Sequence, residues 1–300
     1  MAQFGEPICV APTGDVCGEG PVWHSGEQAL FWTDINRFLI HRFDPASGNV
    51  KSWFFDEPVT ALMLTDRDDT LAVSLASRLI LWEIRSDKRS DHGFALQDSP
   101  FVRLNDGRAD PRGSLWVGSM RNNVKPDGAA GEAGGRDGIL YRIDPDGSVR
   151  EWQRDIGISN TLAWSPDRKT FYFADTLANI IWAYDFDEET GAISDQRTFL
   201  ADFPKGSPDG SQVDGNGYLW NCRYYGKCIV RVAPNGSVDR VIEMPVSNIT
   251  SCTFGGRDLK TLFVTTASAN APVGERLAGG LFAIQTDIAG LPENRFRLFN

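Results

Sequence analysis

One strand-and-turn pattern recurs along the whole chain, and it constrains the fold more than any other sequence feature. Each copy is a polar turn followed by a short strand that begins with Leu or Phe and continues with aromatic, β-branched or small residues. In the six copies these strands begin at Leu30, Leu71, Leu115, Phe171, Leu219 and Leu262. A spacing of about 40 to 55 residues is typical of one four-stranded unit per repeat, and such units bury both faces only by stacking on one another.

The clearest copy occupies residues 156–191 and shows how one unit is built. Its extended first run ends in a Ser-Pro-Asp turn, and β-branched and aromatic runs then cover residues 170–174 and 180–186. Residues 193–200 can supply a fourth strand. No stretch of the chain shows a capped helical period. The sequence therefore predicts an all-β fold, a six-bladed β-propeller of four-stranded antiparallel blades, with residues 1–300 forming one domain.

Two segments interrupt the repeat. Residues 121–137 form a Gly-rich insertion between the second and third strands of the third blade, and residues 267–280 form another in the last blade. The first insertion lacks the Gly-Lys-Ser/Thr ending of a phosphate-binding loop. Each insertion is either plain surface or a lid over the central channel. The ring must also be closed, and either residues 7–10 or residues 295–299 can pair into the last blade.

The charge balance and the cysteines exclude several classes of protein. A formal net charge of -10 argues against a nucleic-acid surface, which needs a basic footprint. The chain begins without a secretory signal pattern and has no apolar run long enough to span a bilayer, so we expect a cytoplasmic protein with no membrane contact. The default oligomeric state is a monomer. The five cysteines lack Cys-x-x-Cys spacing and are expected to be reduced: Cys9, Cys17, Cys222, Cys228 and Cys252.

The first strands of the blades line the channel of a propeller, so equivalent positions on them form a ring. Alignment of the repeats on their second strands gives a ring of Glu19, Thr60 or Ala61, Asn105, Asn160, Asp209, and Ser251 or Cys252. The carboxylates Glu19 and Asp209, with Asn160 between them in blade order, suit a divalent cation that prefers hard oxygen ligands. The alternative is that these Asn and Asp residues only hold turns.

Four motifs occur in an order that resembles the gluconolactonase, senescence-marker-protein (regucalcin) and luciferin-regenerating enzyme family of sugar lactonases. They are Gly18-Glu19-Gly-Pro-Val-Trp, Arg103-Leu-Asn105-Asp-Gly, Ser159-Asn160-Thr-Leu-Ala-Trp-Ser-Pro-Asp and Ser207-Pro-Asp209-Gly. The resemblance covers nearly the whole chain. It implies a six-bladed propeller with one divalent metal ion bound by Glu19, Asn160 and Asp209, and a lactone contacted by Arg103 and Asn105. The chain departs from the commoner Ser-Asn-Gly of the family at Thr161.

The resemblance implies hydrolysis of a sugar lactone to the aldonic acid in carbohydrate catabolism, with Asp209 as the general base. Oxygen ligands favour Ca²⁺, while Zn²⁺, Mn²⁺, Mg²⁺ and Fe²⁺ remain open. Two alternatives stay open as well: a non-catalytic calcium-binding or scaffold propeller, and an arylesterase-like hydrolase of the same fold. No Gly-x-Ser-x-Gly motif occurs, and the histidines His24, His41 and His92 are interpreted as packing or surface residues, the last in a polar loop.

Overall fold

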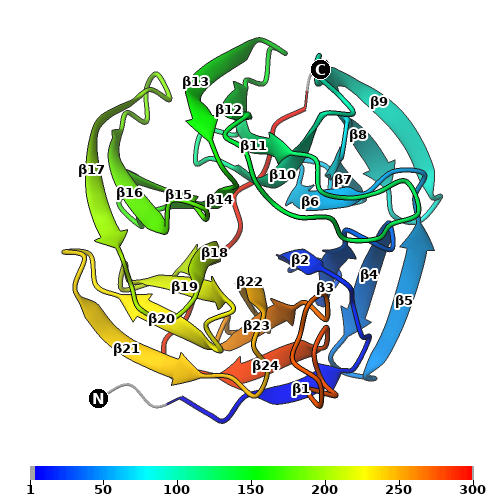
Figure 1. Cartoon of the computed structure of the whole chain (residues 1–300). Helices are drawn as coiled ribbons and strands as arrows, with labels where there is room; N and C mark the ends of the chain where they lie inside the picture. The colour runs from blue at the N-terminus through cyan, green and yellow to red at the C-terminus, as the bar shows by residue number, and fades with distance from the viewer. Residues whose placement is uncertain (1–3, 299–300) are drawn as a thin grey trace.

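The computed structural model describes residues 4–298 as a ring of six sheets, each with four antiparallel strands (Figure 1). No residue in this range is helical. None of it therefore forms a helix that is long and apolar enough to cross a membrane. The prediction of an all-β, six-bladed propeller is confirmed.

The strands follow one order in every blade, from the channel outward. The innermost strands are β2 (Gly18–His24), β6 (Val59–Leu64), β10 (Val102–Ala109), β14 (Ser159–Trp164), β18 (Ser207–Val213) and β22 (Ile249–Gly255). The second strands are β3 (Ala29–Asp34), β7 (Thr70–Leu75), β11 (Leu115–Arg121), β15 (Thr170–Asp175), β19 (Leu219–Tyr224) and β23 (Thr261–Thr266). The third strands are β4 (Leu39–Asp44), β8 (Arg78–Glu83), β12 (Gly138–Ile143), β16 (Ile180–Phe186), β20 (Cys228–Val232) and β24 (Leu281–Gln285). The outermost strands are β5 (Asn49–Phe54), β9 (Lys88–Ala95), β13 (Val149–Ile156), β17 (Ile193–Ala201), β21 (Val238–Glu243) and β1 (Ile8–Ala11).

The N-terminal strand closes the ring. β1 pairs antiparallel with β24 and completes the sixth blade, so the first of the two predicted closures is the one observed. The other segment runs elsewhere. Phe296 forms a parallel bridge with Thr65 beyond β6, in the second blade, and Phe299 lies outside the described residues.

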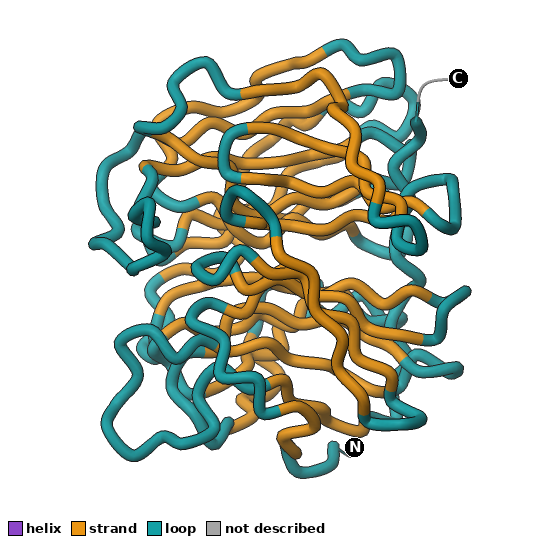
Figure 2. The backbone as a smooth tube through the Cα atoms, turned by 90° about the vertical axis from the view of Figure 1, so that its right-hand side faces the viewer, coloured by secondary structure: helices purple, strands orange, loops and turns teal. Residues whose placement is uncertain are grey.

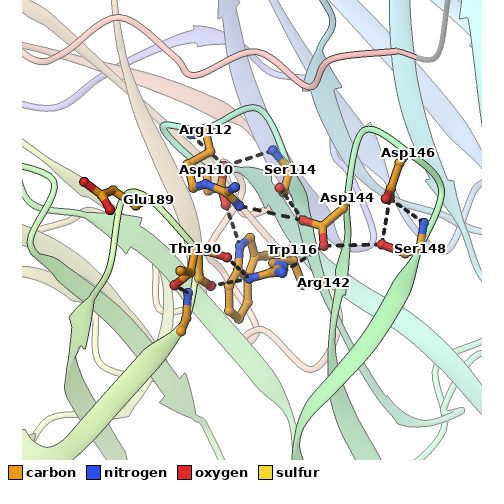
Figure 3. A network of polar contacts seen from close by, with 12 residues as sticks. Asp110, Arg112, Ser114, Trp116, Arg142, Asp144, Asp146, Ser148, Glu189 and Thr190 are labelled. Atoms are coloured by element: carbon orange, nitrogen blue, oxygen red, sulfur yellow. Dashed lines mark hydrogen bonds and ion pairs between the residues drawn. The ribbon is translucent and has the colours of Figure 1, made fainter.

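A repeated turn network anchors the second strand in two of the blades. In the third blade, one Asp110 carboxylate oxygen accepts the backbone N–H groups of Arg112 and Ser114 at 2.8 and 2.9 Å, and the other accepts the indole N–H of Trp116 at 3.0 Å (Figure 3). The same Asp-x-x-Gly-x-Leu-Trp sequence recurs in the fifth blade, where Asp214 takes the position of Asp110. These turns need Gly, because Gly113 has a φ of 91°.

The C-terminal segment crosses one end of the channel. It runs across the ring from the sixth blade toward the second and third blades (Figure 1), and the loops of both ends of the blades are visible from the side (Figure 2). The carboxylate of Glu293 lies on this segment and accepts hydrogen bonds from Gln212 at 2.7 Å and Thr253 at 2.9 Å. Polar contacts therefore tie this segment to the innermost strands at this end of the channel.

Candidate functional site

Every innermost strand contains one irregularity in its pairing with the second strand, and this irregularity lies at the ring of predicted site residues. The shifts fall after Glu19, at Thr60, at Asn105, after Asn160, at Asp209 and at Thr250. A β-bulge breaks the strict alternation of a strand and re-aims the side chains beside it. The same kind of backbone irregularity therefore turns side chains of all six innermost strands toward the axis.

In the last blade, Ser251 pairs with Thr265 as Glu19 pairs with Thr33 in the first blade. Of the two predicted residues, Ser251 is therefore the one equivalent to Glu19. Cys252 lies beyond the bulge, is fully buried and packs in the core of the neighbouring blades. In the second blade, Ala61 pairs with Ser74 at the same offset, and Thr60 lies in the irregularity before it.

The five predicted site residues line one cavity in the channel. The cavity has a volume of about 700 Å³, and its floor contains Glu19, Arg103, Asn105, Asn160 and Asp209. Side chains from four different blades therefore meet at one place. Pockets of this size are common for small-molecule ligands, so the cavity is the candidate site.

Two buried carboxyl groups face one another in the floor. Glu19 is 8% exposed and Asp209 is 6% exposed, and each carboxyl group shifts the pKa of the other. Burial and, to a smaller extent, the nearby Asp106 carboxylate raise the pKa of Glu19 to about 8. Burial and then the charge of Glu19 raise the pKa of Asp209 as well. Without a cation between them, two buried carboxyl groups can lie this close only if one of them stays protonated.

The amide of Asn160 has its orientation fixed by hydrogen bonds. Its Nδ2 donates to the hydroxyl of Thr176 at 2.8 Å, and that hydroxyl donates its one proton to the carbonyl of Pro208 at 2.8 Å. Because the hydroxyl proton is used in this way, Thr176 can only accept from the amide. The Oδ1 of Asn160 is thus the atom left to face the cavity, where Asn105 approaches it at 3.3 Å.

These donors fit a hard divalent cation. Two carboxylates and one oriented carboxamide oxygen are the ligand types that Ca²⁺, Mg²⁺ and Mn²⁺ prefer. Cys17 also lines the cavity, but burial raises the pKa of its thiol well above the usual range, so it remains a neutral thiol. Residues 4–298 contain no cluster of three or more His, Cys, Asp and Glu side chains that could hold a metal. A cation held by the two carboxyls here would therefore need a further oxygen, such as that of the Asn160 amide.

Most N–H groups of the Arg103 guanidinium donate hydrogen bonds to neighbouring residues of the protein. Its Nη1 donates to the Asn105 side chain at 2.7 Å and to the carbonyl of Leu104 at 2.9 Å, while Nε and Nη2 donate to Asn123 at 3.2 and 2.9 Å. Burial lowers the pKa of Arg103 to about 10, which still leaves it protonated at neutral pH. Among the described residues it has no further hydrogen-bond acceptor, so one N–H remains for a substrate.

The Gly-rich insertion forms one wall of the cavity. Asn123, Lys125 and Glu132 of this segment line the cavity, and Asn36 of the first blade donates to the carbonyl of Gly128 at 2.8 Å. The insertion therefore lies over the channel mouth as well as on the surface. Sequence reasoning gave it no contact residues, because nothing in a Gly-rich stretch indicates which side chains turn inward.

The remaining lining residues were missed at the sequence level. They come from the ends of second strands, from the loops that follow second strands, and from the loop before β14, and they include Ile35, Met120, Ile158, Leu177, Tyr224 and Tyr225. No spacing rule connects these positions, so only the fold brings them together. None of the three histidines lines the cavity, and His92 lies in β9 rather than in the polar loop that the sequence predicted. The five cysteines are free, as predicted.

Comparisons with known proteins show which proteins this chain resembles in sequence and fold. The family model of the SMP-30/Gluconolactonase/LRE-like region matches residues 17–268. Pentonolactonase XacC of Haloferax volcanii is 35% identical over 95% of this chain and 96% of its own length, and regucalcin of Gallus gallus is 33% identical over 96% and 97%. The crystal structure of a calcium-binding protein, regucalcin, from Agrobacterium tumefaciens superimposes with a TM-score of 0.90 at 27% identity, with 98% of each chain covered.

Proposed function

This chain belongs to the SMP-30/gluconolactonase/LRE-like family, and on that premise we propose that it is a hydrolase that opens the ring of a sugar lactone with the help of one divalent cation. The observation that carries the proposal is the pair of buried carboxyls, Glu19 and Asp209, beside the oriented oxygen of Asn160 in the floor of an open cavity. Such a pair is costly for a fold unless a cation compensates it. A scaffold propeller has no need of it.

Glu19, Asn160 and Asp209 would hold the cation. When bound there, a divalent ion supplies Lewis-acid chemistry, polarising the lactone carbonyl and lowering the pKa of water. Calcium is the first choice, because the ligands are all oxygen and one similar protein is described as calcium-binding.

The other steps belong to the side chains of the floor. Asp209 accepts the proton of the attacking water as general base. The free N–H of Arg103 donates a hydrogen bond to the substrate oxygen that gains negative charge as the ring opens, and the positive charge of the guanidinium stabilises that oxygen. Asn105 fixes the position of the Arg103 guanidinium relative to the Asn160 amide, since it hydrogen-bonds to both.

The similar proteins favour a sugar lactone. One of them is named a pentonolactonase and another is named 6-deoxy-6-sulfogluconolactonase, the latter 32% identical over 96% of this chain. The second candidate is an aryl ester, which is favoured by the apolar side chains Ile35, Met120 and Leu177 higher in the cavity.

The test is hydrolysis of a panel of pentonolactones, hexonolactones and aryl esters by the wild-type protein with each divalent cation. We expect turnover of a subset of the lactones, with aryl esters slower. Faster turnover of aryl esters than of every lactone would overturn the sugar-lactone assignment. No turnover of either class by folded, cation-loaded protein would favour the non-catalytic alternative.

A further inference from the structure

Two threonine hydroxyls of the fourth blade contact the backbone of the fifth blade on both sides of Asp209. The hydroxyl of Thr176 donates to the carbonyl of Pro208 at 2.8 Å, and that of Thr161 donates to the carbonyl of Asp209 at 2.5 Å. These carbonyls belong to the two peptide groups that flank the Cα of Asp209. Holding both peptide groups fixes the direction in which the Asp209 side chain leaves the backbone.

The same two threonines also flank Asn160. Thr161 follows it in the chain, and Thr176 accepts the hydrogen bond of its Nδ2. If Thr176 could not accept, the amide would be free to rotate and to present its NH₂ group to the cavity. An NH₂ group cannot bind a cation, so the hydroxyl selects the binding orientation.

Thr161 is held in a backbone conformation that is unfavourable for it. Its φ is 54°, in the left-handed region that β-branched residues avoid at a cost of about 1–2 kcal/mol. The side chain is fully buried, and its hydroxyl is also 2.9 Å from the hydroxyl of Ser211. Asn221, which is completely buried, donates to Ser211 at 2.9 Å and completes the network behind Asp209. Backbone strain that is retained inside such a network is typical of functional positions.

We propose that Thr161 and Thr176 are positioning residues for cation binding, a threonine clamp that aims Asp209 and Asn160 at a common point across the seam between two blades. The inference rests on the proposed function, because it takes Asp209 and Asn160 as cation ligands. Partners behind metal ligands typically change metal affinity 10- to 100-fold when they are removed. The clamp acts through backbone carbonyls and an amide, and so it leaves the charge of the floor unchanged.

The test is calorimetric titration of metal-stripped, full-length protein with Ca²⁺, Mg²⁺, Mn²⁺ and Zn²⁺ separately, followed by comparison of variants with the cation that binds tightest. Thr176→Val removes the hydroxyl without changing the shape of the side chain, and Thr176→Ser restores it. The matched control is Thr65→Val. Thr65 is also buried and donates to a carbonyl at 2.8 Å, that of Thr70, but it lies beyond β6, outside the cavity lining.

We expect Thr176→Val to weaken cation binding about 10- to 100-fold and Thr176→Ser to remain within about threefold of the wild type. Thr65→Val should bind the cation as the wild type does, although its melting temperature falls to a similar degree. Thr161→Val and Thr161→Ser repeat the comparison at the other hydroxyl, so that one misfolded variant does not end the test.

Two results would overturn the clamp while leaving the proposed function in place. One is wild-type affinity in folded Thr176→Val and Thr161→Val proteins. The other is a loss of affinity that the serine variants fail to restore. Failure of the wild-type protein to bind any of the four cations would overturn the proposed metal site together with the clamp.

Discussion

Two aspartates of the fifth blade, Asp209 and Asp214, are both buried and yet have opposite surroundings. Asp214 is 0% exposed and accepts the indole N–H of Trp220 at 2.9 Å and two guanidinium N–H groups of Arg231 at 3.0 and 2.7 Å. Asp209 is 6% exposed, and the group that faces it is another acid, Glu19. The buried charge of Asp214 is balanced by donors within the chain, whereas that of Asp209 is not.

The difference separates a stabilising buried charge from a binding one. A buried carboxylate with its donors in place anchors a turn, as Asp214 does and as Asp110 does in the third blade (Figure 3). A buried pair of acids opposes folding until something positive joins it. The two aspartates should therefore respond to mutation in opposite ways, and the following predictions test that contrast.

Asp209→Asn should have the largest effect on activity. The variant loses both the proton acceptor and a charged cation ligand, so we expect kcat/KM on the best lactone to fall about 10³-fold. The unfolding free energy of the metal-free protein should rise by about 1 kcal/mol, because one buried like charge is removed. Steady-state kinetics and urea denaturation measure the two quantities. Activity within tenfold of the wild type would remove Asp209 from the mechanism.

Asp214→Asn should have the reverse effect. Arg231 loses the charged oxygen that accepts two of its N–H groups in a buried place, although Asp239 still contacts it at 2.8 Å. We therefore expect a loss of about 3 kcal/mol in the free energy of unfolding, the lower end of the range for a broken buried pair. The kcat/KM of the folded fraction should stay within about threefold of the wild type, since Asp214 lies outside the cavity lining. A loss of turnover in Asp214→Asn with an unchanged free energy of unfolding would contradict the assignment of Asp214 to stability rather than to the site.

The stability of the metal-free protein should depend on pH through Glu19. Its pKa in the folded protein is raised to about 8, above the value near 4.3 of an unfolded glutamate. The folded state therefore holds the proton more tightly, and the stability that this provides is complete below pH 4 and is lost as the pH rises through 8.

We expect the unfolding free energy in the presence of a chelator to fall by about 2 kcal/mol between pH 5 and pH 8 from this group, an amount reduced from the full shift because the pocket is open to water. Urea denaturation at a series of pH values measures the slope. Glu19→Gln should flatten it. A Glu19→Gln profile with the wild-type slope would assign the pH dependence to other groups.

Asn123→Ala should have the smallest effect and should leave the cation site intact. The substitution removes the acceptor of two Arg103 hydrogen bonds and loosens the wall of the cavity. We expect KM for the lactone to rise about fivefold, equivalent to one ordinary hydrogen bond, with kcat changed less than twofold. Calorimetric cation affinity should not change. A weakened cation affinity would mean that the insertion supports the floor as well as the wall.

The repeat made the fold predictable from the sequence. Six strands beginning with Leu or Phe at one spacing, each followed by a hairpin turn, define six blades, because such blades have no stable arrangement except a closed ring. The ring closure could not be decided in advance, since the N-terminal and C-terminal segments both carry short apolar runs. The observed closure uses β1, and the C-terminal segment crosses the channel instead.

The site was predictable where the side chains are chemically distinctive. Glu19, Asn105, Asn160 and Asp209 stand out as acids and amides at two offsets in the repeat that differ by one residue, and the structure brings them into one cavity. In the sixth blade the alignment left Ser251 and Cys252 open, because a run of Thr, Ser and Cys does not indicate where the bulge falls, and the strand register selects Ser251. The hydroxyl of Thr176 and the walls of the cavity depend on contacts between blades, which a sequence alignment of single repeats does not contain.

The measurement that tests the central claim most directly is lactone hydrolysis by wild-type protein that has been stripped of metal, before and after addition of single divalent cations. The account predicts no detectable turnover by the stripped protein, restoration by a cation that prefers oxygen ligands, and no restoration in Asp209→Asn. Full turnover by protein shown by elemental analysis to contain no metal would contradict it.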